Sequence, residues 1–146
     1  MLIRLFIAVS LLGSVVAFAQ QPGQNTIRVQ IDALRSDKGQ VLCALYSSAD
    51  GYPKSGEKAV AQVKSAIANK HAQCDFTGFA PGTYAVALFH DENSNGKLDS
   101  NFMGIPREGT GASNNANGRM GPPRFDDAAF QFKGGLIELK VSVVYL

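Results

Sequence analysis

The chain has 146 residues, and 14 Lys and Arg against 12 Asp and Glu give a formal net charge of +2 at pH 7. No run of basic residues occurs, so the charge does not indicate a nucleic acid or a charged membrane surface as a partner. The length suits one domain with a buried core.

Residues 1–19 have the pattern of a secretory signal peptide. Arg4 supplies the positive charge, residues 5–16 are almost entirely apolar, and Ala17-Phe18-Ala19 is a small-x-small cleavage signal. The alternative is an uncleaved anchor, but the apolar run is short for about 30 Å of hydrocarbon. We therefore expect cleavage after Ala19 or Gln20, a periplasmic or secreted protein without stable membrane insertion, and one domain over residues 20–146.

The next segments alternate as β-strands do. Residues 27–31 place Ile27, Val29 and Ile31 on one face, and residues 41–46 are apolar on both faces, as in a central strand. Residues 57–69 change period, with Val60, Val63 and Ile67 at helical spacing. This pattern predicts a short amphipathic helix that covers part of a sheet.

Alternation resumes over residues 72–77 and 83–90. Towards the C-terminus, residues 128–132 and 136–145 predict a hairpin about Gly134-Gly135. Six strands and one helix suggest an antiparallel β-sandwich. Residues 91–127, between the fourth and fifth predicted strands, form a long loop rich in Gly and Asn, and such a connection is usually functional or disordered.

Cys43 and Cys74 lie on the inward faces of two predicted strands. An even number of cysteines in an exported chain favours a disulfide. The alternative is a pair of buried free thiols, because Cys is often a small core residue.

The start of the long loop has the spacing of a calcium-binding D-x-N-x-N-G sequence. Oxygen ligands would come from Asp91, Asn93, Asn95, the Lys97 carbonyl and Asp99, with Gly96 at the sharp turn. The alternative is a set of Asx-turns that need no metal. The segment follows a strand, so it is not an EF-hand.

The twelfth position of this loop is Phe102, where a calcium loop normally has a bidentate Glu. The missing acid would have to come from elsewhere in the loop, for which the candidates are Glu108, Asp126 and Asp127. A weak Ca²⁺ site is the only cofactor that we expect.

Other side chains of the loop have more than one interpretation. His90 is a base or ligand in an envelope enzyme that also uses Asp91 or Glu92, or it is a hydrogen-bonded strand end, which is the commoner case. Phe102 and Met103 are expected to pin the loop to the sandwich, and the alternative is a tip that contacts a ligand. Four cations are either an anion site or scattered surface charges: Lys97, Arg107, Arg119 and Arg124.

Four stretches of the chain resemble an exported bacterial family, domain of unknown function 2141. They are PGTYAVA at 81–87, HDENSNGKLD at 90–99, GIPREG at 104–109 and FDDAAF at 125–130. The PGTY turn is also similar to transthyretin-like sandwich domains. The resemblance implies a prealbumin-like β-sandwich of about seven strands, with one strand inside the long loop, and it implies no activity or catalytic residue.

The sequence therefore favours a non-enzymatic module of the cell envelope. It either binds a protein, glycan or small ligand through the long loop, or is a structural domain stabilised by Ca²⁺. A hydrolase-type enzyme based on His90 is the alternative, but no orienting triad is visible.

Overall fold

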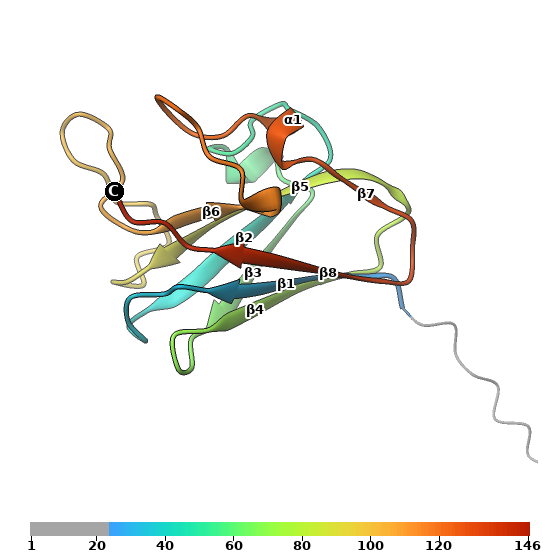
Figure 1. Ribbon diagram of the computed structural model, residues 1–146, viewed down its shortest axis with the longest axis horizontal. Helices are drawn as coiled ribbons and strands as arrows, with labels where there is room; N and C mark the ends of the chain where they lie inside the picture. The colour runs from blue at the N-terminus through green and yellow to red at the C-terminus, as the bar shows by residue number, and fades with distance from the viewer. Residues whose placement is uncertain (1–23) are drawn as a thin grey trace, which may run out of the picture.

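The structure is a computed structural model that describes residues 24–146, so the predicted signal peptide lies outside the described residues. It contains eight strands in two sheets (Figure 1). The first sheet has the order β4 (Ala72–Thr77), β1 (Thr26–Asp32), β8 (Leu136–Ser142). The second has the order β3 (Ala61–Ala66), β2 (Gln40–Tyr46), β5 (Gly82–Asp91), β6 (Thr110–Ala112), and β7 (Phe130–Phe132) also pairs with β5. Three short helical elements complete the fold: η1 (Gly56–Lys58), η2 (Ser113–Asn115) and α1 (Phe125–Ala128).

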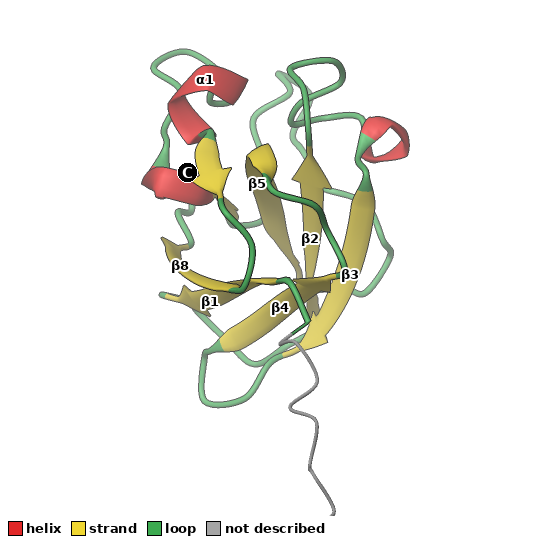
Figure 2. Ribbon diagram, turned by 90° about the vertical axis from the view of Figure 1, so that its right-hand side faces the viewer, coloured by secondary structure: helices red, strands yellow, loops and turns green. Residues whose placement is uncertain are grey.

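The prediction of a mainly β sandwich is confirmed. The sheets pack against each other, and β3 and β4 lie close together where they meet at one side (Figure 2). Apolar side chains from both sheets fill the space between them, among them Ile27, Val29, Val41 and Val86, each with no exposed surface. Strand β6 is a short strand inside the long loop, as the family resemblance implies. None of the helices in residues 24–146 is long and apolar enough to cross a membrane.

The Cys43–Cys74 disulfide is present and joins the two sheets through β2 and β4. The Cα atoms are 6.5 Å apart, inside the range that a disulfide bridges. The bond therefore ties the sandwich across its core.

The predicted helix over residues 57–69 is wrong. This segment forms only the single turn η1 and then β3, which pairs antiparallel with β2. Val63 and Ile67 fit a helical period, but together with Ala61 and Ser65 they also fit a period of two. Pairing with β2 places Ala61, Val63 and Ser65 on the half-buried face, and that tertiary contact decides the structure.

The predicted C-terminal hairpin is also wrong. β7 pairs with β5 in the second sheet, whereas β8 runs parallel to β1 in the first sheet. Gly134 and Gly135 both have positive φ, and the Gly135 amide donates to the Asn25 side chain at 2.9 Å. These glycines carry the chain from one sheet to the other instead of reversing it within one sheet. Val141 and Val143, in and just after β8, are buried.

Candidate functional site

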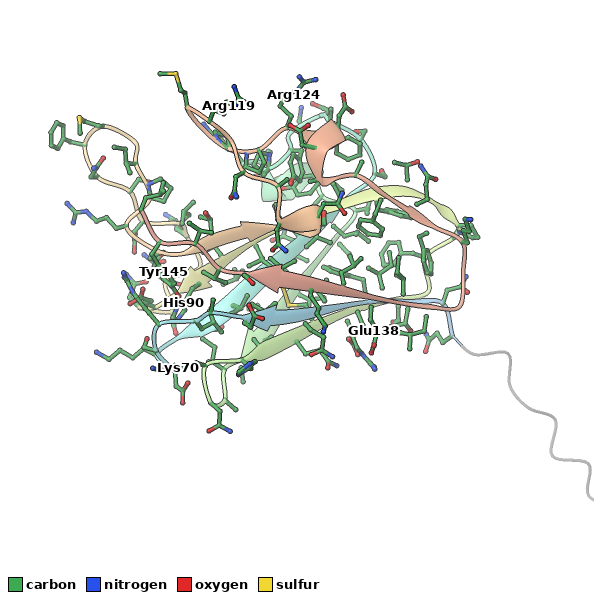
Figure 3. The ribbon with its side chains drawn as sticks, in the orientation of Figure 1. Lys70, His90, Arg119, Arg124, Glu138 and Tyr145 are labelled. Carbon is green, nitrogen blue, oxygen red and sulfur yellow. A yellow bond between two sulfur atoms is a disulfide. The ribbon has the colours of Figure 1, made fainter. Side chains whose placement is uncertain are left out.

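His90 lies near the end of β5 and is completely buried (Figure 3). Its Nε2 lies 2.7 Å from the Lys38 carbonyl, which can only accept, so the proton is on Nε2. In the neutral ring Nδ1 then accepts from the Tyr145 hydroxyl at 2.7 Å, and that hydroxyl accepts from the Arg35 amide at 3.1 Å. Both ring nitrogens are thus occupied by structural hydrogen bonds.

The Arg35 side chain covers this buried pair from outside. Its guanidinium lies 4.4 Å from the centre of the Tyr145 ring and forms an ion pair with Glu92. Oε1 of Glu92 is buried and receives no hydrogen bond, so the charge of Arg35 is what compensates it. Burial raises the pKa of Tyr145, and the negative charge of Glu92 adds to this effect.

Asp91, the first predicted calcium ligand, holds the base of the loop. It is completely buried, and its two oxygens accept from the Gln40 side chain at 2.9 Å, the Asn95 amide at 3.0 Å and the Gly96 amide at 2.8 Å. Burial opposes ionisation, but these hydrogen bonds outweigh it and hold the pKa of Asp91 below its usual value.

Three other predicted ligands converge on one another. The side-chain amides of Asn93 and Asn95 donate to the Asp99 carboxylate at distances between 2.7 and 3.1 Å. The side-chain oxygen of Asn95 accepts from the Lys97 amide at 2.9 Å, which is an Asx-turn. Asp91 bonds to Gln40 and to the loop backbone instead of to this cluster. Within residues 24–146, no three His, Cys, Asp or Glu side chains are placed to hold a metal ion.

Of the three candidate acids for the missing calcium ligand, Glu108 is the one that contacts residues 92–99. It is 5% exposed, and its carboxylate accepts from the Glu92 amide at 2.9 Å and from the Asp99 amide at 3.1 Å. The other two candidates, Asp126 and Asp127, lie on α1 in a later segment. Glu108 therefore ties the beginning of the loop to its middle, a role that spacing alone does not reveal.

The tip of the loop is in solvent, so the prediction that Phe102 and Met103 pin it to the sandwich is wrong. Phe102 is 95% exposed and Met103 is 64% exposed. The Asn101 side chain accepts from the Met103 and Ile105 amides at 2.9 and 3.0 Å, which closes the turn locally. Because this turn holds itself, the apolar side chains do not need to pack on the core.

Exposed apolar side chains gather at this end of the molecule. Nine large ones are exposed in residues 24–146, of which five lie between Leu98 and Met120 and two more, Val144 and Leu146, near the C-terminus. Figure 1 shows the loop after β5 and the loop before α1 projecting at the same end as the C-terminus. In the second loop Met120 is fully exposed.

Of the four loop cations, two line a common hollow. Arg119 and Arg124 line an open hollow of about 420 Å³ built from residues 117–127 alone, and both are labelled in Figure 3. Arg124 pairs with Asp126 at 3.4 Å. Lys97, Arg107 and Arg119 form no ion pair within the part of the chain that the structure describes.

Comparison with known proteins identifies the family. Residues 29–139 match the family model described as "Uncharacterized protein conserved in bacteria (DUF2141)". Comparisons with curated proteins and with solved structures found no match. The matched segment runs from β1 into β8 and includes the whole 91–109 loop. The chain therefore belongs to the DUF2141 family of bacterial proteins.

Proposed function

We propose that this protein is a non-enzymatic binding module of the bacterial cell envelope, reached by export, and that it binds through the 91–109 loop and the 116–124 loop. The observation that carries this proposal is the exposure of Phe102, Met103 and Met120 on loops at one end of the fold. Large apolar side chains that are exposed together on projecting loops favour an interaction site. The closed hydrogen bonding of buried His90 supports a structural role for that residue over a catalytic one.

The test is sedimentation of the purified protein with a total envelope fraction from a bacterium of the same kind. We expect the double variant Phe102→Ser with Met103→Ser to lose most of the association. Leu136→Ser is the matched control, since Leu136 is also exposed, at 58%, but lies at the start of β8. Equal association of all three proteins would refute a role for the loop tip.

We also propose that the 91–99 segment takes one Ca²⁺ ion through Asp91, Asn93, Asn95, the Lys97 carbonyl and Asp99. The convergence of Asn93, Asn95 and Asp99 favours this second role. Rotating an Asn side-chain amide by half a turn exchanges its nitrogen and oxygen, which would aim two amide oxygens at a cation beside Asp99. Asp91 would have to give up hydrogen bonds to the loop backbone to become a ligand.

The calcium proposal predicts a small thermal shift. With two charged side-chain ligands, the dissociation constant should fall near 10⁻⁴–10⁻³ M, roughly that of weak extracellular modules. At about ten times that concentration, binding adds about 1.4 kcal/mol to the stability, which raises the melting temperature by a few degrees. Asp99→Ala and Asp91→Ala should both abolish the shift, and Mg²⁺ should substitute poorly. An unchanged melting temperature between EDTA and about 10 mM Ca²⁺ would leave the Asx-turns as the whole explanation of the motif.

A further inference from the structure

We infer that the open edge of β8 is an interface for a second copy of this chain, which adds its own β8 antiparallel to the first. The sheets that contain the two copies of β8 then form one continuous sheet across a two-fold axis at Leu139. This inference is independent of the proposed function, because it uses neither the 91–109 loop nor the 116–124 loop.

Strand β8 lies at the margin of its sheet, with β1 on one side and no strand of residues 24–146 paired along the other (Figure 2). The Gly135 carbonyl and the Val143 amide bond to β1 at 2.7 and 3.1 Å, so the odd-numbered residues direct their backbone groups to β1. The even-numbered residues direct theirs to the open side. There the amides and carbonyls of Glu138 and Lys140 form no hydrogen bond within the described chain. Such unpaired groups are a template for a further strand.

The open edge ends where β8 ends. The Ser142 amide donates to the Asn115 side chain at 2.9 Å, and Val144 forms a bridge with Thr110. A second strand can therefore pair with residues 137–141 and not beyond them.

The charges of β8 favour one antiparallel register. Backbone groups on the open side bond to each other only when even-numbered residues stand opposite even-numbered residues. Glu138 opposite its own copy, or Lys140 opposite its own copy, would bring like charges together. The register between these two places Glu138 opposite Lys140 of the second copy, twice by symmetry, with Leu139 beside its own copy. A lysine on an edge strand commonly discourages pairing with other chains, and Glu138 offsets that penalty in this register.

The outer face of the sheet carries an alternating row of charges that stops at this edge. Asp75 on β4, Arg28 on β1 and Glu138 on β8 stand opposite one another in register. Arg28 lies 2.9 Å from Asp75 and 3.7 Å from Glu138, which is labelled in Figure 3. Lys140 stands on the next row, opposite the uncharged Gln30, and forms no ion pair in residues 24–146. Lys140 of a second copy continues the alternation beyond Glu138.

The inner side of the edge supplies apolar contact. Ile137 and Leu139 pack against the core but are only partly buried. In the favoured register each Leu139 lies beside the other, and Ile137 lies beside Val141 of the second copy, so pairing covers part of the surface that is still exposed. A single strand edge is a small interface. We therefore expect a weak dimer, with a dissociation constant on the order of 10⁻⁵–10⁻⁴ M.

The test is sedimentation equilibrium of the purified protein from about 5 to about 500 μM, a range that brackets this constant. We expect the wild type to pass from monomer to dimer. Lys140→Glu places acids opposite each other at both symmetric positions and should weaken the dimer by about tenfold or more, and Glu138→Lys should do the same with two cations. An equimolar mixture of the two variants restores opposite charges across the interface, so it should form a heterodimer about as readily as the wild type does.

Lys54→Glu is the matched control, because it makes the same change of charge at an exposed residue in the connection between β2 and η1. It should dimerise as the wild type does. Phe102→Ser with Met103→Ser should also dimerise normally, which separates β8 pairing from self-association through the loop tips. Circular dichroism should show every variant folded, since the substituted side chains are exposed.

A wild type that stays monomeric at about 500 μM would overturn the inference. A dimer that Lys140→Glu leaves intact, or that the loop-tip variant loses, would show that another surface is responsible. Failure of the two charge variants to associate when mixed would refute the register. None of these outcomes decides the envelope sedimentation experiment, which tests the proposed function separately.

Discussion

Replacing Asp91 by Ala removes the acceptor of three N–H donors at the base of the 91–109 loop. The carboxylate is completely buried, and its partners are the Gln40 side chain and the amides of Asn95 and Gly96. Hydrogen bonds to a charged group contribute about 1.5–3 kcal/mol each, but water can replace the carboxylate at the amides of Asn95 and Gly96, which are exposed residues. We therefore expect Asp91→Ala to lower the free energy of unfolding by about 2–4 kcal/mol, which corresponds to a fall of roughly 8–16 °C in melting temperature for a domain of this size.

The control is Asp50→Ala. Asp50 pairs with Lys58 at 2.8 Å, but its side chain is 72% exposed, so its loss should cost no more than about 1 kcal/mol. Unfolding in urea can be followed by far-UV circular dichroism, since the chain contains no Trp. EDTA should be present so that no cation contributes. Equal destabilisation by the two variants would show that the buried hydrogen bonds of Asp91 do not hold the loop.

The pH dependence checks the same reasoning through a different variant, Asp91→Asn. The pKa of Asp91 is lowered in the folded state, so the ionised carboxylate stabilises the fold above the unfolded value of about 3.9. This contribution is lost as the pH falls through the folded-state pKa. The difference in unfolding free energy between wild type and Asp91→Asn should thus be constant from about pH 7 to about pH 5 and shrink below about pH 4. A difference that grows on acidification would contradict the assignment.

Three further predictions concern the β-sandwich from which the loop extends. Removing the Cys43–Cys74 disulfide, which closes a separation of 31 residues, should cost about 3.7 kcal/mol by the chain-entropy model, measured as a lower urea midpoint. Gly39→Ala should destabilise the fold strongly, because the φ of Gly39 is +71° and an added Cβ would lie 1.9 Å from a backbone oxygen. Gly78→Ala, where φ is +82° and the space is open, should cost only about 1–2 kcal/mol. Tyr145→Phe should cost about 1–2 kcal/mol in the same assay, since the hydroxyl links a buried imidazole to a backbone amide; an unchanged midpoint would refute that link.

The alternation of apolar and polar residues in the sequence predicted most of the strands of the sandwich. β1, β4 and β5 lie within about one residue of their predicted ranges, because each buries one face of a sheet and the pattern records that burial directly. β3 was not predicted as a strand, because Val63 and Ile67 satisfy both the helical and the strand period. The parallel pairing of β8 with β1 was not predicted either. Strand order depends on where Gly134 and Gly135 direct the chain and not on the alternation within the strand.

In the candidate site, spacing identified the residues but not their partners. The D-x-N-x-N-G pattern correctly marked a turn built on Asp91 and Gly96. Glu108 lies well after Asp91 in the chain, and only the return of the loop towards β5 brings its carboxylate to the Glu92 amide. The exposure of Phe102 contradicted the usual rule that large apolar side chains lie inside, because Asn101 closes the tip without help from the core.

The connection between β5 and β6 is longer than the pairing of these strands requires, and this length supports the proposal that it is a binding loop. β5 and β6 are adjacent antiparallel strands, which a hairpin of two to five residues, roughly, would suffice to join. Residues 92–109 are used instead, and the buried carboxylate of Glu108 holds them in a defined form. Leaving Phe102 in water forgoes about 1.5–3 kcal/mol that burial would contribute. The surplus length and the ordered hydrogen bonds support the proposal that the exposed tip contacts another surface, while the base keeps the loop in shape. We therefore expect substitutions at the base and at the tip of the loop to have different effects. Asp91 variants should lose stability, and Phe102 variants should lose only association.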